Sequence, residues 1–136
     1  MSWLFQSVPK RYDLATNMKA GKTETWLVTR YGNELKKGDV VFLWMGGEPS
    51  VRGLYGWGRI TGSATRYYKD WGSGIDVHYR EKFPHHIPYT HVRALKSMAE
   101  HVLFKTAVGT NFKLTDEQTE DLRRLIVREH GKGSAP

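Results

Sequence analysis

Short apolar segments separated by turn residues run along most of the chain. Apolar, aromatic and β-branched residues predict strands over residues 3–6, 25–29, 40–45 and 52–65. Residues 40–45 are apolar on both faces, which indicates a central strand covered on each side. Residues 75–83 alternate between apolar and polar side chains, which predicts an edge or partly exposed strand, and residues 102–105 are a candidate for the last strand.

Helical signals are weaker in the body of the chain than at its end. Asp13 can cap a short helix over residues 14–18 that Gly21 ends. Residues 89–100 favour helix, with a possible capping box at residues 97–100.

The clearest helix follows Thr115, which forms a capping box with Gln118. Its apolar stripe is Leu122, Leu125 and Ile126, and Gly131 follows its last turn. The small residues after this helix predict a flexible tail over residues 131–136.

Several short strands with helices at the margins favour the α+β class. We expect one domain over residues 1–130, built as a bent β-barrel of five to six strands with short flanking helices and a C-terminal helix. A chain of 136 residues buries enough surface to fold as a single domain without a metal or a disulfide.

Three glycines interrupt the aromatic residues of the segment 53–58, and two interpretations of them stay open. Glycine permits tight bends at a barrel corner. It also lets the backbone approach a flat ligand closely, with Trp44, Tyr55 or Trp57 as a wall of the pocket. In the second interpretation the glycines clear space for the ligand.

The charge of the chain favours a polyanionic partner. The net charge is +7, and residues 1–114 hold 17 Lys and Arg against 9 Asp and Glu, whereas residues 115–136 hold 4 against 5. Cations release counterions from phosphates, and an aromatic content of 12% suits base stacking. The alternative is that the charge only keeps the protein soluble. The absence of cysteine and of a long apolar run predicts a soluble, cytoplasmic protein without a membrane partner.

Catalytic and metal-binding motifs are not recognisable. The chain has no Walker-type glycine loop, no nucleophile-elbow serine and no helical histidine pair flanking a glutamate. Solvated loop histidines are a better interpretation than a zinc site for the cluster of His85, His86 and His91. A metal-dependent nuclease needs carboxylates gathered around Mg²⁺. Asp70, Asp76 and Glu81 are not spaced along the sequence in a pattern typical of such a site. We therefore expect no catalytic residue, metal or cofactor.

Five ordered segments of the chain closely resemble the EVE domain: residues 3–13, 25–31, 37–44, 53–58 and 109–115. The resemblance spans about residues 2–129. It implies a PUA-like bent barrel, related to the YTH and ASCH domains. It also implies recognition of a modified base, chiefly modified cytosine in DNA, whereas YTH domains recognise methylated adenine in RNA.

The resemblance also implies site residues. Trp26 is the first candidate for a wall of an aromatic cage, Trp44 the second, and Tyr55 or Trp57 the third. Each of these rings has an ordinary alternative, which is burial in the core.

Polar groups at the pocket are the candidates for reading the Watson–Crick edge of the base: Gln6, Ser7, Thr110 and Asn111. Their alternative is to satisfy turns. Many relatives carry a lysine and a glutamate within the segment where this chain has Gln6-Ser7-Val8-Pro9. The candidates for phosphate contacts are Lys10, Arg11, Arg30 and Arg52, which otherwise are solvated surface cations.

Three functions follow. The leading hypothesis is a non-enzymatic reader that flips out and binds a modified base in DNA, such as 5-methyl- or 5-hydroxymethylcytosine, and that recruits a separate effector such as a nuclease. The second is a module that reads modified RNA. The third is an enzyme or small-molecule binder on the same barrel, because fold does not determine function.

Overall fold

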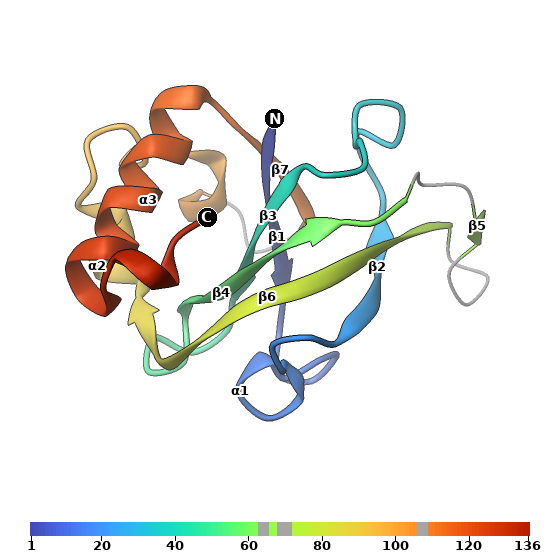
Figure 1. Cartoon of the computed structure of the whole chain (residues 1–136). Helices are drawn as coiled ribbons and strands as arrows, with labels where there is room; N and C mark the ends of the chain where they lie inside the picture. The colour runs from blue at the N-terminus through green and yellow to red at the C-terminus, as the bar shows by residue number, and fades with distance from the viewer. Residues whose placement is uncertain (63–65, 68–71, 106–108) are drawn as a thin grey trace.

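A curled sheet in the form of a half-barrel makes up the body of the molecule (Figure 1). The computed structural model describes residues 1–62, 66–67, 72–105 and 109–136. Within these residues, six strands are hydrogen-bonded in the order β2-β6-β4-β3-β1-β7, and the two-residue β5 pairs with β6. The strands are β1 (Ser2–Ser7), β2 (Thr23–Val28), β3 (Val40–Met45), β4 (Gly53–Ile60), β5 (Arg66–Tyr67), β6 (Ser73–Pro88) and β7 (Asn111–Leu114). The α+β class and the bent barrel are confirmed.

Helices lie against the sheet, with α2 and α3 on one side (Figure 1). The helical segments are α1 (Leu14–Asn17), α2 (Tyr89–Arg93), η1 (Val102–Phe104), α3 (Asp116–His130) and η2 (Lys132–Ser134), where η marks a 3-10 turn. None of the described helices is long and apolar enough to cross a membrane.

β3 lies in the middle of the sheet, as its apolar sequence predicts. It pairs in parallel with β1 and antiparallel with β4. Its side chains enter two different cores: Val41 and Leu43 face the interior of the curl, and Phe42 and Trp44 face the layer of α2 and α3. Burial on both faces requires the uninterrupted apolar run.

β6 is longer and more central than its sequence suggests. It pairs with both β2 and β4, so of the two predicted alternatives the edge strand is wrong. The partly exposed strand is confirmed, since buried side chains alternate with exposed ones. Pro84 favours an early end of the strand because proline has no N–H to donate. In the structure Pro84 lies where the pairing with β4 shifts register, between the Gly56–Lys82 and Leu54–Ile87 pairs. No ladder bond is therefore needed at that position.

The glycines of β4 accommodate the neighbouring strand. A Cβ atom on Gly56 would lie 2.1 Å from the carbonyl oxygen of Glu81, and one on Gly58 would lie 2.5 Å from that of His78. Both positions flank register shifts between β4 and β6. The barrel-corner interpretation therefore holds, and these glycines do not clear space for a ligand.

The segment between β6 and β7 departs most from the sequence predictions. α2 ends at Arg93, and Ser97 does not begin a capping box, since its hydroxyl donates to Asp121 at 2.6 Å. Residues 102–105 were expected as the last strand, but Val102–Phe104 forms the 3-10 turn η1. The last strand is instead β7, which pairs with β1.

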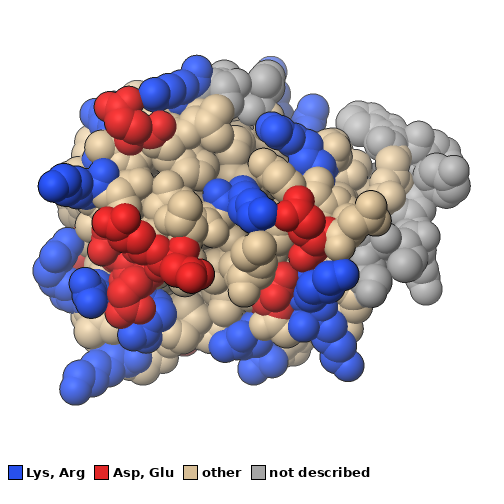
Figure 2. Space-filling view, turned by 90° about the horizontal axis from the view of Figure 1, so that it is seen from above, with Lys and Arg blue, Asp and Glu red and all other residues tan. Residues whose placement is uncertain are grey.

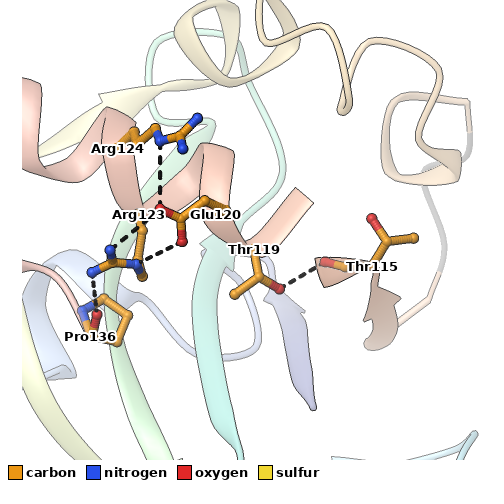
Figure 3. Close-up of polar contacts among 6 residues, drawn as sticks. All are labelled: Thr115, Thr119, Glu120, Arg123, Arg124 and Pro136. Atoms are coloured by element: carbon orange, nitrogen blue, oxygen red, sulfur yellow. Dashed lines mark hydrogen bonds and ion pairs between the residues drawn. The ribbon is translucent and has the colours of Figure 1, made fainter. Parts of the chain in front are cut away.

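α3 begins and ends as predicted. Thr115 and Gln118 form the capping box, and Gly131 is the C-cap. Figure 3 shows the Thr115 carbonyl accepting from the Thr119 hydroxyl, and Glu120 paired with the guanidinium groups of Arg123 and Arg124.

Residues 131–136, expected to form a flexible tail, are docked on the body of the protein. The Trp57 indole donates to the Ser134 carbonyl at 2.8 Å, and Arg123 donates to the Pro136 oxygen at 3.0 Å (Figure 3). Ala135 packs against the core beneath α3. These contacts hold residues 131–136 against the protein, although the small residues of this segment do not by themselves favour a defined structure.

Candidate functional site

A cleft of about 430 Å³ opens where β1 and β3 end side by side. Because these strands are parallel and Gln6 pairs with Trp44, the residues that follow both strands meet at the same edge of the sheet. The described residues that line the cleft are Gln6, Val8, Trp44, Gly46, Gly47, Arg52, Leu103, Phe104 and Lys105. Three of the predicted site residues, Gln6, Trp44 and Arg52, come together here.

The Gln6 side chain lies across the cleft wall. Its Nε2 donates to the carbonyl oxygen of Gly109 at 2.9 Å, and its backbone N–H donates to the Thr110 carbonyl at 2.7 Å. A Cβ atom on Gly46 would lie 2.8 Å from Gln6 Oε1. The absence of a side chain at Gly46 therefore leaves room for this amide.

Two aromatic rings form another wall. Trp44 is only 1% exposed and meets Phe104 edge to face, with ring centroids 5.8 Å apart. Phe104 is part-exposed. Phe104 therefore offers the accessible ring surface, and Trp44 supports it from below.

Arg52 and Lys105 supply positive charge at the cleft. Arg52 donates to the Gly47 carbonyl from Nε at 3.1 Å and from Nη2 at 2.6 Å, and its guanidinium lies over the Tyr89 ring. Lys105 pairs with Glu100, but both side chains are exposed, so water weakens this ion pair. No Asp or Glu is among the described residues lining the cleft.

Trp26 belongs to the interior of the curl and does not line the cleft. It is 6% exposed, its indole N–H donates to the Tyr79 hydroxyl at 2.9 Å, and its ring meets Phe5 and Tyr12. Burial raises the pKa of Tyr79 far above its usual range, so this hydroxyl stays protonated and donates to Tyr12. These contacts account for Trp26 as a core residue, and its assignment to the wall of a cage stays a prediction.

Tyr55 and Trp57 are likewise buried outside the cleft, on opposite faces of β4. The Tyr55 hydroxyl donates to the Val51 carbonyl at 2.6 Å, and its ring stacks on His86. Trp57 is covered by the docked tail. Trp44 is the only one of the four predicted cage rings among the described cleft-lining residues.

The remaining polar candidates serve the backbone. The Ser7 hydroxyl donates to the Tyr12 carbonyl at 2.9 Å. Thr110 contributes its carbonyl to Gln6. Asn111 is 1% exposed; its Oδ1 accepts from the Thr29 N–H at 2.8 Å and its Nδ2 donates to the Leu27 carbonyl at 3.1 Å. Asn111 thus joins the outer strands β2 and β7 and closes the curl.

The other predicted phosphate contacts are exposed cations. Lys10 and Arg11 follow Pro9, whose Cδ would lie 3.3 Å from a Cβ atom on Gly47, so this turn borders the cleft. Arg30 lies over the Tyr31 ring. Figure 2 shows cations and carboxylates interspersed on the face seen from above, so that face carries no continuous positive surface.

The three clustered histidines have separate partners and lie on β6 and α2, not in a loop. His91 pairs with Glu129 at 2.7 Å, His86 stacks on Tyr55 and His85 lies against His130. Burial, followed by the charge of His85, lowers the pKa of His86. No group of three metal-ligating side chains is present among the described residues.

Sequence reasoning missed the side of the cleft that η1 provides. Leu103, Phe104 and Lys105 fall in the segment that was expected to be a strand. The one available signal was His101, a residue able to cap a turn, which accepts from the Leu103 N–H at 2.9 Å. Gly46 and Gly47 were visible as a turn, but their neighbours in space were not.

The EVE domain family model matches residues 1–125. The chain belongs to the EVE domain family. The sequence resemblance is therefore confirmed over nearly the whole chain. No curated protein matches this EVE domain.

Solved structures share the fold of this EVE domain at low sequence identity. Protein Atu2648 from Agrobacterium tumefaciens has a TM-score of 0.73 at 17% identity, covering 99% of this chain and 98% of that one. A protein from Pseudomonas putida has a TM-score of 0.70 at 21% identity, with coverages of 92% and 99%. Human THYN1, solved in complex with 5-methylcytosine-containing DNA, has a TM-score of 0.71 at 16% identity, with coverages of 94% and 97%.

Proposed function

We propose that this EVE domain binds a modified base, 5-methyl- or 5-hydroxymethylcytosine in DNA, turned out of its strand into the cleft. The proposal rests on the groups that line the cleft together. They are the part-exposed ring of Phe104, the side-chain amide of Gln6, and the cations Arg52 and Lys105. The complex of THYN1, a protein of the same fold, with 5-methylcytosine-containing DNA supports the choice of ligand.

The size of the cleft suits this ligand. A volume of about 430 Å³ lies within the range of roughly 300–1,000 Å³ that is usual for small-molecule sites. Turning a base out of a duplex costs a few kcal/mol, and stacking on an aromatic ring returns about 1–3 kcal/mol. The Phe104 ring provides that stacking surface.

The chemistry of the cleft favours binding over catalysis. Among the described lining residues there is no Ser, Cys, His, Asp or Glu to act as a nucleophile or general base. Arg52 and Lys105 position phosphates without reading the sequence. Action on the DNA then falls to a separate effector, such as a nuclease.

The test is the substitution Phe104→Ala, because Phe104 is part-exposed while Trp26 and Trp44 belong to the cores. We expect the variant to fold and to lose about 1–3 kcal/mol of affinity, roughly 5- to 150-fold, for DNA with one 5-methylcytosine. Phe104→Tyr, which keeps the ring, is expected to bind nearly as well as the wild type. Fluorescence anisotropy with matched oligonucleotides measures each affinity.

The ligand panel contains DNA with cytosine, 5-methylcytosine or 5-hydroxymethylcytosine, and RNA with adenine or N6-methyladenine. Val102→Ala is the control on η1, since Val102 is 48% exposed and does not line the cleft. Affinities that are blind to modification, or unchanged by Phe104→Ala, contradict the proposal. Tighter binding of RNA with N6-methyladenine than of any DNA in the panel would support the second hypothesis, a module that reads modified RNA.

A further inference from the structure

Among the described residues, the Gln6 amide has a hydrogen-bond partner for Nε2 and none for Oε1. Nε2 donates to the Gly109 carbonyl at 2.9 Å. No described residue donates a hydrogen bond to Oε1, which lies beside Gly46 in the cleft wall. Oε1 therefore borders the proposed ligand site with lone pairs that no described residue uses.

The Gly109 carbonyl determines which way the Gln6 amide is turned. With the amide reversed, Oε1 would face the Gly109 oxygen, and two acceptors would repel each other where a hydrogen bond now forms. On the other side, the missing side chain of Gly46 leaves space for the oxygen. The amide is thus oriented by its hydrogen bond to Gly109 and presents Oε1 as an acceptor.

We propose that Gln6 Oε1 accepts a hydrogen from the exocyclic amino group of the bound base and so makes this domain reject thymine. Thymine carries the same 5-methyl group as 5-methylcytosine but has a carbonyl oxygen in place of the amino group. A pocket that recognised only the methyl group and the ring would accept both bases. Opposite Oε1, thymine places acceptor against acceptor and leaves both without a partner.

This inference rests on the proposed function, and four bases test the two ideas separately. Cytosine, 5-methylcytosine, uracil and thymine are placed in turn at one position of the same DNA duplex, opposite an abasic site so that no base pair has to be broken. The 5-methylcytosine-to-cytosine ratio of affinities measures recognition of the methyl group. The 5-methylcytosine-to-thymine ratio measures recognition of the amino group.

We expect the wild type to bind 5-methylcytosine at least about tenfold more tightly than thymine. Gln6→Met, which has a similar shape and no acceptor amide, is expected to bring the two affinities within about twofold. The chain offers a matched control in its other glutamine, since Gln118→Met makes the same chemical change at the cap of α3. Gln118→Met is expected to keep the full preference.

A wild-type protein that binds 5-methylcytosine and thymine equally, or a folded Gln6→Met variant that keeps the preference, overturns the inference. If either result comes with tighter binding of 5-methylcytosine than of cytosine, the proposed function stands. Equal binding of 5-methylcytosine and cytosine contradicts the proposed function instead. If Gln6→Met does not fold, Gly46→Ala is used instead, because its Cβ would displace Gln6 Oε1. Gly46→Ala must then abolish the preference for 5-methylcytosine over thymine.

Discussion

Two buried tryptophans differ in what they contact, and these contacts decide which of them belongs to the cleft. Trp26 and Trp44 are both strand tryptophans, and both are buried to more than nine tenths. Trp26 has its N–H satisfied by Tyr79 inside the curl, whereas Trp44 supports the part-exposed ring of Phe104. A strand tryptophan is more often a core residue than a ligand contact, and the contacts of Trp26 follow that tendency.

Glycines at two positions of the same hairpin give a prediction at this scale. Gly46→Ala is expected to change the free energy of unfolding by less than about 1 kcal/mol, because the only close contact of its Cβ would be with the end of the Gln6 side chain, and Val8 Cγ1 would lie at an ordinary 3.6 Å. Gly56→Ala is expected to destabilise the protein by at least about 3 kcal/mol, because its Cβ would lie 2.1 Å from the backbone carbonyl of Glu81. Urea denaturation measures both values. Equal losses of stability would show that the two glycines serve the same purpose.

At the scale of elements, a side-chain cap explains why the segment 102–105 is not a strand. Its valine, leucine and phenylalanine fit a strand by composition, but His101 Nδ1 accepts from the Leu103 N–H and starts the turn η1. The ring is thereby in the tautomer with hydrogen on Nε2, which faces the Lys113 carbonyl. η1 in turn places Leu103, Phe104 and Lys105 at the cleft.

This cap predicts a dependence of stability on pH. Burial lowers the pKa of His101 below its ordinary value of 6.5, with a smaller opposing effect of the Lys113 carbonyl. The folded protein therefore binds fewer protons at this residue than the unfolded chain, and its stability falls as the pH decreases below about 6.5. Thermal unfolding measured at several pH values between 7.5 and 5 checks this effect.

His101→Asn is the matched variant, because asparagine can cap a turn and does not titrate in this range. We expect its unfolding temperature to depend less on pH than that of the wild type. The pKa of His86 is also lowered, so part of the dependence should remain in the variant. An identical pH dependence in both proteins would exclude His101 as a source.

At the scale of the whole molecule, the curl of the sheet is completed by one side chain. β2 and β7 end the strand order, and the Asn111 amide joins them through Leu27 and Thr29. Neither strand reveals this contact in its own sequence, since more than 80 residues separate the partners. The Asn111 amide is therefore occupied by contacts that close the curl, and its role at the base stays a prediction.

Asn111→Ala is expected to destabilise the protein by about 2–4 kcal/mol, because the variant loses a buried side chain and two part-buried hydrogen bonds, to the Thr29 N–H and the Leu27 carbonyl. Asn17→Ala is the matched control: its side chain makes an exposed bond to the Asp13 carbonyl and should cost less than about 1 kcal/mol. Chemical denaturation gives both values. A loss for Asn111→Ala no greater than that for Asn17→Ala would contradict the closing role.

The sequence by itself determined those features whose causes are local. Short apolar runs predicted β1 and β3, and the apolar stripe of Leu122, Leu125 and Ile126 predicted α3. Capping chemistry placed Asp13 and Thr115, and ordered motifs identified the EVE family. Tertiary structure decided the features that depend on distant partners. β6 continues past Pro84 because a register shift removes the need for an N–H at that position. Residues 131–136 lie against the body of the protein because Trp57 and Arg123 donate hydrogen bonds to them. The cleft belongs to this second group, since Gln6, Gly46 and Phe104 meet only when β1, β3 and η1 pack together.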